Sequence, residues 1–146
     1  MKHWKLLGGC SLALLSATAW ASEPIGDLDQ FEARYIACLE SELANDCLDK
    51  TFKAHALPWS KSSYPKEVTE FVSTWIGEDE VYKVHPIETK TVGVLFEKRR
   101  YLIERGTGDL MLFSVHFRSV KGQWFYVNLQ FSNDAKTLAA VTLDTP

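Results

Sequence analysis

The fold is decided by residues 111–131, which read MLFSVHFRSVKGQWFYVNLQF. Apolar and polar residues alternate on both sides of a Lys-Gly pair, the pattern of two half-buried antiparallel strands joined by a tight turn. If the apolar residues of both strands share one face, Phe117 pairs with Phe125 and residues 120–122 form the loop, with Gly122 in the left-handed conformation. The apolar row is Met111, Phe113, Val115, Phe117, Phe125, Val127, Leu129 and Phe131.

The same register places six other side chains together on the opposite face of this hairpin. An imidazole beside a phenol suits acid–base chemistry, and an arginine over an indole suits an anionic ligand. We interpret this row first as a solvated sheet face, and second as the surface on which ligand or partner binding should be tested. Its predicted cross-strand pairs are Arg118 with Trp124, His116 with Tyr126, and Ser114 with Asn128.

The first half of the chain has helical periodicity, and the change to strands falls near Gly77. Asp27 is a predicted N-cap for a first helix that ends near Asn45, and a short second helix starts from Asp46. Pro65 lies in the first turn of a third helix, whose apolar residues recur at helical spacing until Gly77. The sequence therefore predicts three helices before the sheet.

Further strands are predicted on both sides of the 111–131 hairpin. Residues 97–105 fit strand and helix spacing alike, and we favour a strand because β-forming residues precede them and residues 106–109 resemble a hairpin turn. The predicted fold class is α+β, with N-terminal helices packed on one face of a curved antiparallel β-meander. The remaining predicted strands are Val81 to Pro86, Thr91 to Glu97 and Thr137 to Leu143.

Residues 1–21 have the pattern of a cleavable secretory signal, with Lys2 and Lys5 before an apolar run and a cleavage site that ends at Ala21. The run is about half of the roughly 20 residues that a membrane anchor needs. Cys10 lies too close to Lys5 for a lipoprotein signal. We expect residues 22–146 to form one periplasmic or secreted domain with no integral membrane segment.

The two cysteines of that domain, Cys38 and Cys47, are predicted to form a disulfide, because an even number in an oxidising compartment favours pairing. Their spacing is not that of a redox pair. The signal contains two lysines and no acid, so its removal lowers the formal net charge of −3 by two, to −5. An acidic domain is not expected to bind nucleic acid.

No catalytic or phosphate-binding motif is present, and neither His55 nor His85 has a second ligand at metal-site spacing. No cofactor and no metal are therefore predicted. The basic cluster at residues 97–100, with Arg105 nearby, is interpreted as a solvated strand whose charges protect the sheet edge. A docking site for an acidic partner or a carboxylate ligand is the alternative interpretation.

Three helices followed by a meander, with residues 122–126 reading Gly-Gln-Trp-Phe-Tyr, resemble the cystatin-like group that includes the NTF2-like domains. The resemblance implies a curved sheet around a long helix, often with a pocket that some members use for isomerase or dehydratase chemistry and many use for binding. Enzymatic members carry an Asp or Glu base, or an Asp–His pair, in that pocket, and the apolar row has none. We predict a non-enzymatic domain that binds a protein partner or a small apolar ligand, with an NTF2-like pocket enzyme as the alternative.

Overall fold

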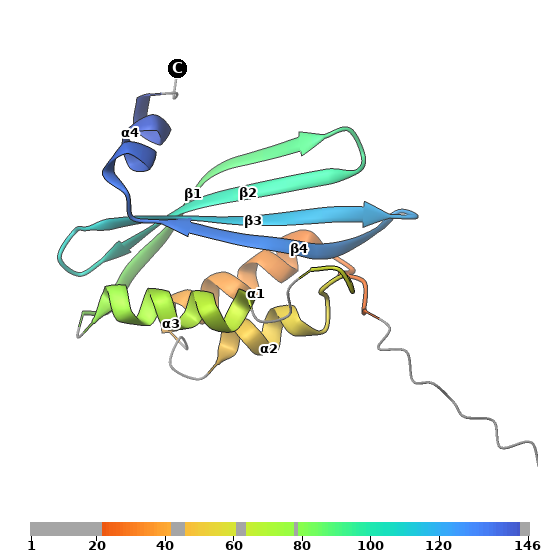
Figure 1. The fold of residues 1–146 in the computed structure, drawn as a ribbon, viewed down its shortest axis with the longest axis horizontal. Coiled ribbons are helices and arrows are strands. Elements are labelled where there is room, and N and C mark those ends of the chain that lie inside the picture. Colours follow the sequence, from red (N-terminus) through yellow and green to blue (C-terminus); the bar gives the residue numbers. More distant parts are fainter. Residues whose placement is uncertain (1–21, 42–45, 61–63, 78, 144–146) are drawn as a thin grey trace, which may run out of the picture.

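The computed structural model describes residues 22–41, 46–60, 64–77 and 79–143, so the predicted signal at residues 1–21 lies outside them. The strands form one antiparallel sheet in the order β1-β2-β3-β4. Helices α1, α2 and α3 cover one face of the sheet, and α4 lies on the other side (Figure 1). The predicted α+β meander is confirmed. Its elements are α1 (Leu28–Ser41), α2 (Cys47–Lys53), α3 (Tyr64–Ile76), β1 (Val81–Val92), β2 (Phe96–Arg105), β3 (Leu110–Val120), β4 (Gln123–Ser132) and α4 (Ala135–Leu143).

The three predicted N-terminal helices form for the reasons that the sequence indicates. Asp27 caps α1, because its Oδ1 accepts the backbone N–H groups of Asp29 and Gln30 at 2.9 Å each. Helix α3 ends at Gly77, whose φ of +64° is a conformation that glycine adopts without strain. The predicted end of the first helix near Asn45 lies outside the described residues.

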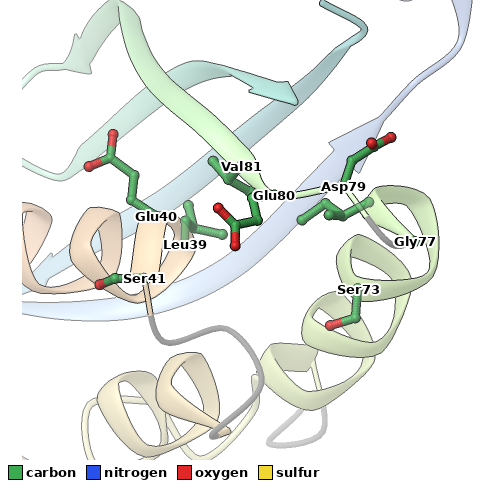
Figure 2. Close-up of a pocket in the computed structure, with 9 residues that line it drawn as sticks. Leu39, Glu40, Ser41, Ser73, Gly77, Asp79, Glu80 and Val81 are labelled. Atoms are coloured by element: carbon green, nitrogen blue, oxygen red, sulfur yellow. The ribbon is translucent and has the colours of Figure 1, made fainter. Parts of the chain in front are cut away.

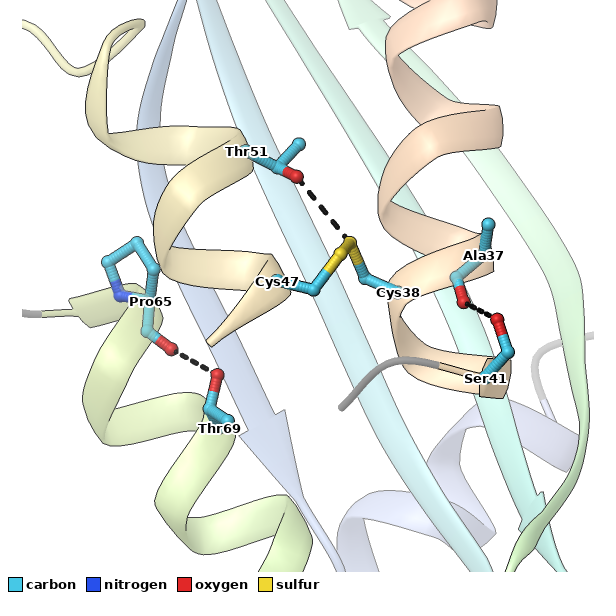
Figure 3. Close-up of a disulfide and its surroundings, with 7 residues drawn as sticks. All are labelled: Ala37, Cys38, Ser41, Cys47, Thr51, Pro65 and Thr69. Atoms are coloured by element: carbon cyan, nitrogen blue, oxygen red, sulfur yellow. Dashed lines mark hydrogen bonds between the residues drawn. A yellow bond between two sulfur atoms is a disulfide. The ribbon is translucent and has the colours of Figure 1, made fainter. Parts of the chain in front are cut away.

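A disulfide between Cys38 of α1 and Cys47 of α2 joins the two helices, with Cα atoms 5.4 Å apart (Figure 3). The hydroxyl of Thr51 lies 3.5 Å from the sulfur of Cys38. Closing a loop of this length stabilises the fold by about 2.5 to 3 kcal/mol in the chain-entropy model. The predicted disulfide is confirmed, and such bonds persist in oxidising compartments.

Aromatic side chains fill the space between the helices and the sheet. Phe31 of α1, Phe52 of α2 and Tyr126 of β4 have no exposed surface. The ring centroids of Phe31 and Phe52 are 5.0 Å apart, and those of Phe52 and Tyr126 are 4.9 Å apart, both in edge-to-face geometry.

Among the described helices, none has the length and hydropathy needed to cross a membrane.

The first hairpin is longer than the sequence predicted. Strand β1 is continuous from Val81 to Val92, and the chain then turns at Gly93, whose φ is +54°. The predicted strand from Thr91 to Glu97 was wrong, because this positive φ and a hydrogen bond from the N–H of Leu95 to the carbonyl of Val92 make the segment a turn. The strand favoured for residues 97–105 is confirmed as β2.

Strands β3 and β4 pair in a register that differs from the predicted one. His116 pairs with Asn128, but Phe117 pairs with Tyr126, so Val127 is the extra residue of a β-bulge. A bulge reverses which residues of β4 point to which face. The predicted register, which assumed unbroken alternation along both strands, was therefore wrong.

The turn of this hairpin also differs from the prediction. Val120 pairs with Gln123, so the loop holds two residues rather than the predicted three. Lys121 and Gly122 have φ values of +52° and +78°, and positive φ at both positions is what a type I′ turn requires. Phe125 consequently lies opposite Arg118 and not opposite Phe117.

The C-terminal segment is a helix, so the strand predicted from Thr137 to Leu143 was wrong. The carboxylate of Asp134 accepts the backbone N–H of Thr137 at 2.9 Å and its hydroxyl at 3.0 Å, which caps α4. Alanine, the strongest helix former, occupies three of its nine positions. The cap and the alanines outweigh the β-forming residues of the segment.

Candidate binding face

The outer face of the sheet, which we define as the side turned away from α1, α2 and α3, is built by the register of the four strands. Directly opposed residues share a face, and successive residues alternate between faces. The outer face therefore consists of rows that cross the sheet. From the hairpin tips toward α4 they are Val92–Phe96–Arg118–Phe125, Lys90–Lys98–His116–Asn128, Glu88–Arg100–Ser114–Gln130 and Leu102–Leu112–Ser132.

Four of the six predicted site residues, which are Ser114, His116, Arg118 and Asn128, lie together on the outer face. Within this group the predicted cross-strand partners change. His116 lies opposite Asn128 rather than Tyr126, and Ser114 lies opposite Gln130 rather than Asn128. The structure thus brings these four residues together in a different arrangement.

Trp124 and Tyr126 lie on the helix-facing side of the sheet, so their predicted place beside His116 and Arg118 was wrong. Trp124 packs against the hydrophobic core, and Tyr126 is fully buried. The bulge at Val127 is the cause, because it turns these two side chains inward.

Arg118 does lie against an indole, but the indole is that of Trp59. The Cζ atom of Arg118 is 5.7 Å from the ring centroid of Trp59 and 5.7 Å from that of Phe96. Trp59 reaches this position because the chain after α2 runs beside β4, where Ala56 bridges to Tyr126. Sequence reasoning assigned Trp59 only to a connector. A large aromatic residue in a Pro- and Ser-containing connector was the available signal.

The apolar tip, which we define as Trp59, Val92, Val94, Leu95 and Phe96, is the most exposed hydrophobic part of the outer face. Its side chains are 42–82% exposed. The tip is tied to the sheet, because the N–H of Ser119 donates to the carbonyl of Leu95 at 2.8 Å. Contiguous exposed apolar surface of this kind marks interaction sites.

The basic groove lies farther along the outer face, between the sheet and α4. It has a volume of about 490 Å³. The end near the second and third rows carries Lys98 and Arg100, and Thr137 comes from α4. Its lining residues are Lys98, Arg100, Leu112, Ser114, Gln130, Phe131, Ser132 and Thr137.

The cations of the outer face are close to one another and only partly neutralised. Burial, reinforced by the charge of Arg100, lowers the pKa of Lys98. Burial, reinforced by the charge of Lys98, lowers the pKa of His116. The Nη1 of Arg100 donates to Glu88 at 2.9 Å, a bond that lowers the pKa of the Glu88 carboxyl.

Three nitrogen atoms of this face are buried without a hydrogen-bond partner in the part of the chain that the structure describes. They are Nε of Arg100, Nε2 of His116 and Nε of Arg118. Buried polar atoms normally have partners, and each exception needs an explanation, such as a bound water or ion or a functional role. The outer face therefore has two arginine donors and one imidazole nitrogen to offer a ligand.

The predicted basic cluster at residues 97–100 is divided between the two faces. Lys98 and Arg100 point outward, whereas Arg99 points toward the helices. The Arg99 guanidinium contacts Glu97 and Glu32 at 2.6 Å each and Asp29 at 2.8 Å. The solvated-strand interpretation was therefore wrong for Arg99, whose side chain is buried within an ion-pair network. The expected protection of a sheet edge was also wrong, because β2 is an inner strand that pairs with β1 and β3.

A second hollow of about 480 Å³ lies where the ends of α1 and α3 meet the start of β1. Figure 2 shows that the carboxylates of Glu40 and Asp79 point away from that of Glu80. Glu40 accepts the backbone N–H of Val84 at 2.9 Å. No group of three or more His, Cys, Asp or Glu side chains that could hold a metal is found among the described residues. The carboxylates that line this hollow therefore do not converge on one point.

No family model matches this chain, and no curated protein matches it. One solved structure that is similar to it is that of a SEC-C motif containing protein from Rhodopseudomonas palustris. That protein is 14% identical, with a TM-score of 0.38, and the match covers 67% of this chain and 72% of that one. A likeness of this size supports no inference about fold or function.

Proposed function

We propose that this protein is an exported, non-enzymatic domain that binds a protein partner through its apolar tip. The observation that carries the proposal is the position of Arg118 against the exposed rings of Trp59 and Phe96. Tryptophan and arginine dominate the binding energy of many protein interfaces, where they lie at the centre of an apolar patch. Val92, Val94 and Leu95 extend the patch on the same hairpin turn.

The charges beside the tip indicate the chemistry of the partner. Lys90, Lys98 and Arg118 lie in the first two rows of the outer face, next to the tip. The chain as a whole has a formal net charge of −3, so this positive region differs in sign from the rest of the molecule. A partner with an apolar anchor and acidic residues around it would match both features.

The packing of the interior favours binding over chemistry in a pocket. An NTF2-like pocket enzyme would hold its substrate between the helices and the sheet. In the described part of the chain, Phe31, Phe52 and Tyr126 occupy that space and contact one another. The surface with free donors and exposed rings lies on the opposite side of the sheet.

Two features support export. The disulfide between Cys38 and Cys47 is of the kind that persists in oxidising compartments. Residues 1–21 carry the sequence pattern of a cleavable signal. Together they support a periplasmic or secreted location and a domain that starts at Ser22.

Photo-crosslinking from the tip tests the proposal. A photoreactive phenylalanine analogue replaces Leu95 in one variant and Tyr82 in a control, since Tyr82 is also an exposed apolar residue but lies at the start of β1, far from the hairpin turn. We expect the exported protein, identified by an intact mass that begins at Ser22, to form a discrete adduct from position 95 and not from position 82.

The partner identified in this way is then purified and its affinity measured by calorimetry. Trp59→Ala and Leu95→Asp should each weaken binding by at least tenfold, as truncation of a central interface residue does. Tyr82→Ala should leave the affinity unchanged. Equal adducts from positions 95 and 82, or an affinity that neither tip variant changes, would overturn the proposal.

A further inference from the structure

We infer that the basic groove is a binding site for a small organic acid, whose acid group contacts Lys98 and Arg100. The groove and the apolar tip are different parts of the outer face. Lys98 borders both, but Arg100, Leu112 and Thr137 line the groove alone, so the groove can bind a ligand whether or not the tip binds a protein.

The two cations of the groove indicate that its ligand carries an acid group. Lys98 and Arg100 alternate with Arg99 along β2, so both project from the outer face into the groove. Among the described residues, no carboxylate lies within ion-pair distance of Lys98, and Arg100 pairs with Glu88 through Nη1 alone. The Nε of Arg100 is buried without a partner. An anion in the groove would receive charge-assisted hydrogen bonds from both side chains.

The electrostatic cost of holding these cations together also points to an anion. Lys98 is placed near Arg100 and partly removed from water, and both effects lower the pKa of its ammonium group. Glu88, the acid whose charge acts on Lys98, is already engaged by Arg100. A bound acid group would offset the repulsion and supply the counter-charge that the described residues lack.

The organic part of the ligand is indicated by the remaining walls. Leu112 provides apolar surface and lies one row closer to α4 than Arg100 does, whereas the ring of Phe131 packs against Phe71 of α3 on the helix-facing side. Ser114, Gln130 and Thr137 add polar atoms that would fix orientation. A volume of about 490 Å³ is in the range of small-molecule sites. The groove thus matches a molecule with a charged end and a short hydrocarbon body.

Nuclear magnetic resonance with three probes tests this inference on the domain from Ser22 to the C-terminus. The probes are octanoate, 1-octanol, which lacks the charge, and inorganic phosphate, which lacks the hydrocarbon. We expect octanoate to shift the backbone amide signals of Ser114, Gln130 and Thr137, and to bind more tightly than either other probe. Equal binding of octanol, equal binding of phosphate, or no shift at these amides would overturn the inference.

Charge-removing variants locate the site. Arg100→Gln and Lys98→Gln should each weaken octanoate binding by about tenfold or more, the usual effect of losing a hydrogen bond to a charged group. Lys66→Gln removes an exposed charge from α3, on the other side of the sheet, and should leave binding unchanged. Lys98→Gln removes no ion pair with the described residues, so it keeps the test valid if Arg100→Gln fails to fold. Unchanged affinity in a folded Lys98→Gln protein would overturn the inference.

Discussion

Arg99 and Arg100 are adjacent in the chain but serve opposite faces of the sheet. Arg99 is 6% exposed and contacts three carboxylates, those of Asp29, Glu32 and Glu97. Arg100 contacts one, that of Glu88, and its Nε has no partner among the described residues. A buried charge must be matched by protein groups, whereas a charge at a groove can be matched by a ligand.

The surroundings of the two arginines extend this difference. On the helix-facing side, the hydroxyl of Tyr101 bonds Glu32 and the hydroxyl of Tyr35, so the carboxylates around Arg99 are themselves held. Burial acts to lower the pKa of Arg99, but its bonds with Glu97 and Asp29 outweigh burial and raise it. The charged groups of the inner network are paired with one another, whereas the outer cations are only partly paired.

Replacing each arginine should give the largest difference in stability between the two faces. Arg99→Met leaves three carboxylates without their shared cation, and we expect the free energy of unfolding to fall by about 3 to 5 kcal/mol. Arg100→Met removes a pair that is partly exposed to water and should cost about 0 to 1 kcal/mol. Chemical denaturation of both variants measures the difference. Equal losses would show that the inner network adds no more stability than the outer pair.

Much of the fold was predictable because its signals are local. Asp27 caps the helix that the periodicity indicates, and Gly77 ends the third helix. The spacing of Cys38 and Cys47, with their expected compartment, predicted the disulfide that joins α1 and α2. Alternation along residues 111–117 predicted β3 and the face that it buries.

The site was less predictable because it depends on one residue of β-sheet register. Trp124 to Val127 are all apolar or aromatic, so alternation does not reveal which of them face the core. The bulge at Val127 decides it, and bulges follow from the packing of the whole sheet. Trp59 was missed for a related reason, because a contact 59 residues along the chain, with Arg118, places it.

Removing the hydroxyls of two buried tyrosines should change the free energy of unfolding by intermediate amounts. The Tyr101 hydroxyl bonds Glu32 and Tyr35, so Tyr101→Phe should lower the free energy of unfolding by about 1 to 3 kcal/mol. The Tyr126 hydroxyl is buried with no hydrogen bond to any described group, and Tyr126→Phe should leave stability unchanged or raise it by about 1 kcal/mol. Both variants keep the aromatic ring, so each measures the hydroxyl.

Denaturation of the two phenylalanine variants at one pH gives the test. Burial raises the pKa of both hydroxyls, so neither ionises near neutral pH and the comparison involves neutral groups. A loss in Tyr126→Phe as large as that in Tyr101→Phe would show that the Tyr126 hydroxyl has a partner, such as an ordered water.

The smallest effect concerns His116 and the pH dependence of stability. Burial and then the charge of Lys98, which lies opposite on β2, lower the pKa of His116 below its ordinary value of 6.5. Arg118 and Arg100 are further cations of the same face, and Glu88 is its neighbouring acid. The folded protein therefore resists protonation of His116 more than the unfolded chain does.

The lowered pKa of His116 makes the folded protein less stable at acidic pH. The contribution of neutral His116 to stability is fully present above the unfolded pKa of about 6.5, and it is lost as the pH falls through the lower, folded pKa. The free energy of unfolding should thus decrease on acidification from pH 7.5 to 5, and the decrease should be smaller in His116→Gln. Urea denaturation of both proteins across this range measures it, and the difference between the two curves separates His116 from the other histidines. If the two curves run parallel, neither burial nor the charge of Lys98 lowers the pKa of His116, and the outer face does not oppose protonation of this residue.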